Sequence, residues 1–184
     1  MTGTRVRSWT VPGAGGGCQG GVHRRRASLL RVPVPQRVLI AREAGYRTDT
    51  IGHYRDGQFY AAVHGAHRDA DHAPDWGRER VRWYAFLHLF DADGNHRRSE
   101  IALIGIAPRL SGGLGEQAAA QQTSLLGQLE DTSFGDIAIR PFSVTYDGVT
   151  FGLIDESGPD RGSWAELYPD RLGFTDPWDG TYST

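Results

Sequence analysis

Residues 134–156, FGDIAIRPFSVTYDGVTFGLIDE, form the stretch that most clearly predicts the fold. Two runs rich in β-branched and aromatic residues flank Asp147-Gly148, a dipeptide that favours a two-residue type I′ turn between antiparallel strands. A turn at this position places Tyr146 opposite Val149, and the alternation of side chains then makes one face of the hairpin apolar and the other mostly polar. The apolar face, predicted to lie in the core, comprises Phe142, Val144, Tyr146, Val149, Phe151 and Leu153.

A second hairpin is predicted around Asp56-Gly57. Strands over residues 48–55 and 58–64 would meet at this turn, with Tyr54 opposite Phe59. One face of the hairpin is apolar, and the other is only half polar, which indicates that both faces are at least partly covered.

A third hairpin is predicted from residues 78–91 and 99–107, which Asp93-Gly94 connects. Both segments are apolar on their two faces, a pattern typical of central strands that are covered on both sides. Upstream, residues 38–44 are apolar and form either a strand or one helical turn, because so short a segment does not distinguish the two.

One helix is predicted over residues 114–131, LGEQAAAQQTSLLGQLED, whose apolar side chains share one stripe. Gly127 is unfavourable by about 1 kcal/mol relative to alanine inside a helix, so the last turn is expected to fray. Residues 163–184 carry five aromatic side chains, too many to leave in water. The sequence therefore predicts an α+β fold: an antiparallel sheet of about five to seven strands from three hairpins, one main helix and an aromatic C-terminal tail packed on the sheet.

The composition predicts a single domain over residues 35–184. The chain has 184 residues and one cysteine, Cys18, which excludes an internal disulfide framework and a cysteine-based zinc site. No apolar run approaches the ~20 residues needed to span a bilayer, so the expected compartment is the cytoplasm. Residues 1–34 hold six arginines and no acid, and we interpret them as a disordered basic tail or as the product of a start codon assigned too early.

The charge of the predicted domain bears on its partners. Residues 35–184 hold fourteen arginines and twenty-two acidic residues. Because phosphate binding requires a basic face, this balance disfavours nucleic acid as a partner of the core.

The acidic, aromatic C-terminal region is the predicted partner-binding surface. Aromatic anchors within a charged rim are typical of protein-binding patches. The alternative is that the aromatic side chains belong to the core and the acids are merely solvated. The candidate residues are Trp164, Glu166, Tyr168, Asp170, Asp176, Trp178 and Asp179.

Histidines supply the other candidate site. His64, His67 and His72 lie close together with Asp69 and Asp71, and a metal such as zinc would need three or four such ligands to converge. Their spacing matches no established zinc signature, so the alternative is a polar loop that happens to be rich in histidine. No catalytic residue and no cofactor is predicted.

Two further histidines have apolar neighbours. His88 lies in the run FLHLF, where a hydrogen-bonded core histidine is the more common outcome than a catalytic base. His53 is similar, and either histidine would be pH-sensitive if partly buried.

Several segments resemble a family of small actinobacterial proteins labelled formate hydrogenlyase regulatory protein. These segments lie between residues 43 and 59, between 82 and 94, and between 164 and 180, so that the resemblance covers roughly residues 36–184. It includes EAGYRTDTIG with DGQF, RWY with FDADG, and WAELYP with PWDG. The resemblance implies a regulator of hydrogenase gene expression, and it carries no catalytic motif.

Together these features predict a non-enzymatic cytoplasmic regulatory or protein-interaction module that contacts another protein through its acidic, aromatic C-terminal surface. The alternative is a small-molecule-binding protein or metal-dependent enzyme that uses residues 64–72. The sequence predicts no membrane contact and leaves the partner and the oligomeric state open.

Overall fold

A computed structural model describes residues 33–68 and 80–184 of the chain. Residues 31–184 form one compact unit, to which all the described residues belong. The predicted N-terminal tail falls almost wholly outside the described residues.

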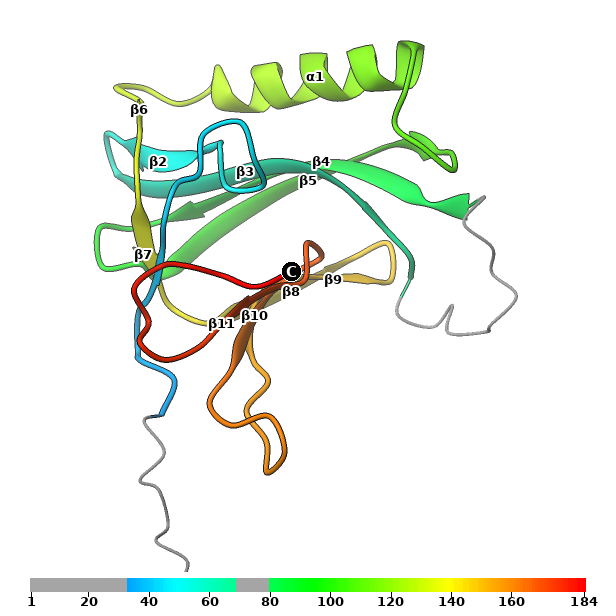
Figure 1. Cartoon of the computed structure of the whole chain (residues 1–184). Helices are drawn as coiled ribbons and strands as arrows, with labels where there is room; N and C mark the ends of the chain where they lie inside the picture. The colour runs from blue at the N-terminus through cyan, green and yellow to red at the C-terminus, as the bar shows by residue number, and fades with distance from the viewer. Residues whose placement is uncertain (1–32, 69–79) are drawn as a thin grey trace, which may run out of the picture. The chain divides into compact units, whose positions relative to one another are not determined.

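The structure is an α+β arrangement of mostly antiparallel strands with one helix. A five-stranded sheet has the order β5-β4-β3-β2-β6, and the helix α1 lies over one of its faces (Figure 1). The elements are β2 (Ile51–Tyr54), β3 (Gly57–Ala66), β4 (Arg82–Phe90), β5 (His96–Ile106), β6 (Ser133–Phe134) and α1 (Gly113–Leu126).

A four-stranded sheet of order β11-β10-β9-β8 covers the other face of the five-stranded sheet, as Figure 1 shows. A two-stranded sheet of β1 and β7 flanks both. The strands are β1 (Val38–Ile40), β7 (Ile137–Ile139), β8 (Phe142–Tyr146), β9 (Val149–Asp155), β10 (Ala165–Tyr168) and β11 (Leu172–Phe174).

The two faces of the five-stranded sheet belong to two separate cores. The core beneath α1 contains Phe59, Leu87 and Leu125, whereas the core between the two larger sheets contains Tyr60, Phe86 and many side chains of β9, β10 and β11. Strand β4 contributes to both, which confirms the prediction that it is a central strand covered on both sides.

The hairpin of β8 and β9 has the predicted register, with Tyr146 opposite Val149 and Phe142 opposite Leu153. Its burial is uneven because β8 is an edge strand. Phe151 and Leu153 on β9 are fully buried, whereas Tyr146 on β8 is 40% exposed.

The register predicted for the second hairpin is wrong by two residues. Tyr54 pairs with Gly57 rather than with Phe59, so that Arg55 and Asp56 form the turn. Gly57 is the first residue of β3, and a side chain at this position would collide with the carbonyl oxygen of Phe90, which lies 2.0 Å from the site of a Cβ. A shift of two residues leaves the same side chains on each face, so the predicted faces are retained.

Two other predictions need correction. The strand predicted over residues 99–107 begins earlier, at His96, and lies at the edge of its sheet, where Leu103 and Ile106 are exposed. The C-terminal segment is not a tail across a single sheet, because β10 and β11 extend the sheet that begins with β8 and β9. The described residues therefore form eleven strands in three sheets, more than the five to seven strands expected.

The helix ends at Leu126, and Gly127 caps it, earlier than the predicted end at residue 131. Within the described residues, no helix is both long and apolar enough to cross a membrane.

Candidate functional site

Asp170 is the centre of a polar site on the inner face of β3. Its side chain lies in the connection between β10 and β11 and is only 3% exposed. The hydroxyl of Tyr60 donates to Oδ2, and Nδ1 of His64 contacts Oδ1. From a third segment, Nη1 of Arg47 donates to the backbone carbonyl of Asp170 at 2.9 Å.

The position of the two β3 residues follows from strand geometry. Tyr60 and His64 are four residues apart, and side chains at even spacing point to the same face of a strand. That face packs against the four-stranded sheet, which brings in the β10–β11 connection from the other side. Three segments that are distant in the sequence therefore meet at one carboxylate.

Burial is the main cause that raises the pKa of the Tyr60 hydroxyl well above its usual value, and the charge of Asp170 adds to it. The hydroxyl therefore stays protonated at neutral pH and acts as the donor. A buried carboxylate is stable only when donors satisfy its oxygens, and here Tyr60 and His64 serve one oxygen each.

A pocket of about 300 Å³ opens beside this carboxylate. His64 and Asp170 line it together with residues of the loop before β2 and one helix residue. The full lining is Gly45, Tyr46, Arg47, Asp49, Thr50, Ala62, Val63, His64, Gln122 and Asp170. His64 is 27% exposed, and among the described residues its Nε2 has no hydrogen-bond partner.

Some polar groups that line the pocket are already bonded to other parts of the protein, and others could bond a ligand. Thr50 donates its hydroxyl to the carbonyl of Ala61 and accepts from Gln122 Nε2 at 3.2 Å. Asp49 is paired with Arg42 at 2.5 Å. Arg47 makes no ion pair with any described residue, so the available groups are its remaining guanidinium N–H groups and Nε2 of His64.

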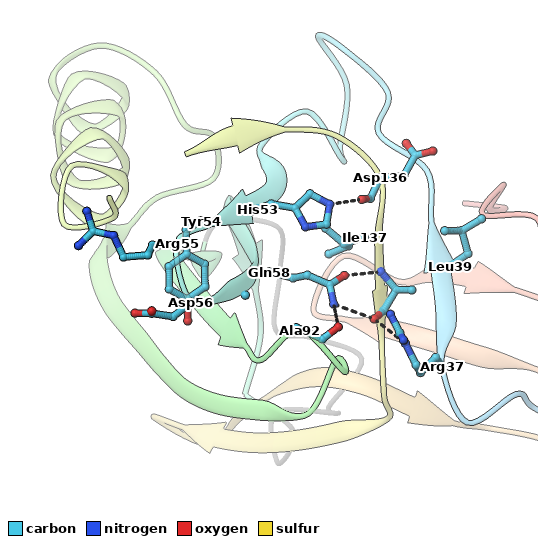
Figure 2. A pocket seen from close by; sticks show the side chains of 12 residues that line it. Arg37, Leu39, His53, Tyr54, Arg55, Asp56, Gln58, Ala92, Asp136 and Ile137 are labelled. Atoms are coloured by element: carbon cyan, nitrogen blue, oxygen red, sulfur yellow. Dashed lines mark hydrogen bonds between the residues drawn. The ribbon is translucent and has the colours of Figure 1, made fainter. Parts of the chain in front are cut away.

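A second, larger pocket of about 410 Å³ lies where β7 meets the second hairpin (Figure 2). Its central polar group is the amide of Gln58, which is 3% exposed. The amide accepts from the backbone N–H of Ala138 at 2.7 Å and donates to the Ala138 carbonyl at 3.2 Å, and Figure 2 shows it also reaching Ala92. His53 contacts the carbonyl of Asp136. These bonds hold two segments of the chain together, so we interpret this pocket as a structural seam.

The structure separates the residues of the predicted partner-binding surface. Glu166 is 6% exposed and receives Arg161, Arg171 and the indole N–H of Trp164. Asp170 lies in the buried site described above. The remaining members are Tyr168 and Trp178, which are half-buried, and Asp176 and Asp179, which are exposed.

The structure describes only some of the residues of the predicted metal site. His64 contacts Asp170, and His67 is exposed. His72, Asp69 and Asp71 lie outside the described residues. Within the part of the chain that the structure describes, no three side chains of His, Cys, Asp or Glu converge as metal ligands would.

His88 is a core residue, as its apolar neighbours predict. It is fully buried among the rings of Phe86, Phe142 and Phe151, and its Nδ1 lies 2.6 Å from Ser99 Oγ. Burial lowers the pKa of His88 to about 3, so the ring is neutral at physiological pH.

Sequence reasoning placed Asp170 and His64 in two different candidate sites and did not include Tyr60 or Arg47 in either. The alternation of side chains along the predicted strand places Tyr60 and His64 on the same face. It does not predict that Asp170 lies beside them, because that contact joins segments 110 residues apart. Comparisons of the chain with models of protein families, with curated proteins and with solved structures found no match.

Proposed function

We propose that the protein is a non-enzymatic binding module that takes the carboxylate group of a ligand in the pocket beside His64. The observation that carries this proposal is the buried Asp170, which holds Nδ1 of His64, a residue that lines the pocket and whose Nε2 has no hydrogen-bond partner among the described residues. Pockets lined by a few convergent polar groups are the usual binding sites of proteins.

The charges favour an anionic group. Arg47 supplies a guanidinium that makes no ion pair with a described residue, although it donates to the Asp170 carbonyl and lies 6.0 Å from the centroid of the Tyr46 ring. Its planar fork matches a carboxylate in geometry. His64 supplies a second group, Nε2, which has no hydrogen-bond partner among the described residues, while Nδ1 of the same ring contacts Asp170. A volume of about 300 Å³ lies at the lower end for ligand sites, so the pocket suits a small group.

Binding is favoured over covalent catalysis because the carboxylates that line the pocket are already engaged, Asp49 by Arg42 and Asp170 by Tyr60 and His64. No serine, cysteine or lysine is among its described lining residues, and the hydroxyl of Thr50 is committed to Ala61. Histidine alone could move a proton, but nucleophilic catalysis also requires a nucleophile within its reach.

A regulatory role agrees with this proposal. The resemblance to the formate hydrogenlyase regulatory family implies a regulator, and a regulator without a catalytic centre needs a site at which it senses or contacts something. The pocket beside His64 could serve as such a site.

Titration with sodium acetate, followed by amide chemical shifts in nuclear magnetic resonance spectra, tests the proposal. Sodium chloride at equal ionic strength is the blank. We expect saturable shifts at Arg47, His64 and Val63, and about tenfold weaker binding after Arg47→Gln or His64→Gln.

Arg37→Gln is the matched control, because Arg37 is an exposed arginine that lines the other pocket. It should leave acetate binding unchanged. Shifts that never saturate, or that respond equally to all three substitutions, would overturn the proposal.

A further inference from the structure

Strand β3 has an open edge beside the His64 pocket. Strand β4 pairs with β3 up to Ala66, whereas β2 pairs with it only up to Tyr60, opposite Ile51. The last residues of β3 therefore lack a neighbouring strand on the β2 side within the described residues.

The register identifies the groups on this edge. Tyr54 and Gly57 close a two-residue turn, so every second residue from Gly57 directs its N–H and C=O toward β2. Ala61 follows this rule: its N–H donates to Thr50 O at 2.9 Å, and its carbonyl accepts from the hydroxyl of Thr50. The next residues of the series are Val63 and Gly65, whose backbone groups on this side have no partner in the described part of the chain.

The open edge and the His64 pocket are one continuous site. Ala62, Val63 and His64 line the pocket from β3, and Thr50 lines it where β2 would continue. Gln122 reaches it from the helix layer and Asp170 from the four-stranded sheet, so the pocket spans the sheet edge from one face to the other.

We propose that the ligand is an extended peptide with a free C-terminal carboxylate, which pairs with β3 along Val63 and Gly65. This inference rests on the proposed function and identifies the kind of molecule whose carboxylate the pocket binds. Exposed edges with unpaired backbone groups are templates for added strands, and main-chain hydrogen bonds supply the affinity of such complexes.

The charges decide the direction of the peptide. A peptide antiparallel to β3 continues the line of β2, and its C-terminus ends at Thr50, beside Arg47 and His64. A parallel peptide would bring its N-terminal ammonium group to the same cation. The antiparallel direction is therefore the favourable one.

The test uses a pool of fluorescent acetylated pentapeptides, made as free acids, as C-terminal amides and as acids with backbone N-methyl groups, and measures anisotropy. We expect the free acids to bind more tightly than acetate. Amidation and N-methylation should each weaken binding about tenfold, the first by removing the charge and the second by removing edge hydrogen bonds.

Val63→Pro tests the same edge from the protein side. Because the N–H of Val63 faces the open edge, proline removes one donor without breaking the ladder to β4. It should weaken peptide binding about tenfold relative to Val63→Thr, the matched control that keeps the N–H at this position. If the proline variant does not fold, the N-methylated peptides decide.

The outcomes separate the two proposals. Acetate binding without tighter peptide binding, or equal binding of N-methylated or amidated peptides, overturns the peptide and leaves the carboxylate pocket intact. If neither acetate nor the peptides bind, both proposals, the carboxylate pocket and the peptide ligand, are overturned.

Discussion

His64 and His88 lie on the same face of the same sheet and have opposite environments. Tyr60 shares the face of His64 along β3 and pairs directly with His88 on β4. His88 is central, fully buried and bonded to a hydroxyl, whereas His64 is at the open edge, part-exposed and bonded to a carboxylate.

The difference shows what turns a sheet histidine into a candidate site. Burial without a charged partner stabilises the neutral ring and makes His88 part of the core. A carboxylate at Nδ1, a place in the pocket lining and an Nε2 without a hydrogen-bond partner among the described residues leave His64 able to contact a ligand. Position in the sheet, central or edge, decides which of the two occurs.

The largest expected effect is acid destabilisation through His88. Its folded-state pKa of about 3 lies below the unfolded value of about 6.5. The neutral ring therefore contributes stability that is fully present above pH 6.5 and is lost as pH falls toward 3. Between pH 7 and pH 4 the linkage amounts to about 3 kcal/mol, measurable by urea denaturation.

His88→Leu removes this titration and should make the profile less steep between pH 6.5 and pH 4.5, where His96, whose pKa burial also lowers, keeps part of the slope. This window lies above the range in which Asp91, Asp147 and Asp179 protonate, since hydrogen bonds lower the pKa of each. A variant with the same acid profile as the parent would show that His88 does not drive the effect. The comparison between the two histidines would then lose its basis.

The next effect concerns Gln58, which tests whether a buried polar group can be purely structural. Gln58→Leu leaves the Ala138 N–H without its partner and the Ala138 carbonyl with only the 3.4 Å bond from Arg37 Nε, which should cost roughly 2–3 kcal/mol. Acetate affinity should not change, because Gln58 lines the other pocket. A loss of acetate binding in a folded Gln58→Leu variant would contradict our division of the two pockets.

Sequence patterns predicted those features that depend on local chemistry. The turn at Asp147-Gly148 and the facing of β8 and β9 follow from turn preference and alternation, and both are confirmed. The burial of His88 follows from a strand that is apolar on both faces. In each case the decisive residues are neighbours in the sequence or direct partners across a tight turn.

Features that depend on distant pairing were missed. The turn at Arg55-Asp56 and the edge position of β5 follow from which residues and strands pair, and alternation reveals neither of them. The candidate site is of the same kind. His64 and Asp170 were both singled out, but only the packing of one sheet on the other joins them.

Tyr60→Phe is expected to have a smaller effect than either change above. It removes the donor to Asp170 Oδ2 and leaves one buried carboxylate oxygen unsatisfied, for a cost of about 2 kcal/mol in urea denaturation. Tyr84→Phe is the matched control, because its carboxylate partner Asp147 keeps Arg68 and Arg82. Equal losses in the two variants would mean that the burial of Asp170 adds nothing to the strength of its bonds.

Asp170→Asn should change stability least and discriminates most sharply between the two histidines. An amide keeps the shape and can still accept from His64 and donate to the Tyr60 oxygen, so only the charge assistance is lost, about 1 kcal/mol. Acetate affinity should nevertheless fall about tenfold, because a neutral amide oxygen holds Nδ1 of His64, and with it the ring at the pocket, less firmly than a carboxylate does. The ring of His64 would then be bonded through Nδ1 to a neutral oxygen, as the ring of His88 is. If the asparagine variant binds acetate as the parent does, the carboxylate of Asp170 is a packing feature, and the contrast between the two histidines reduces to solvent access alone.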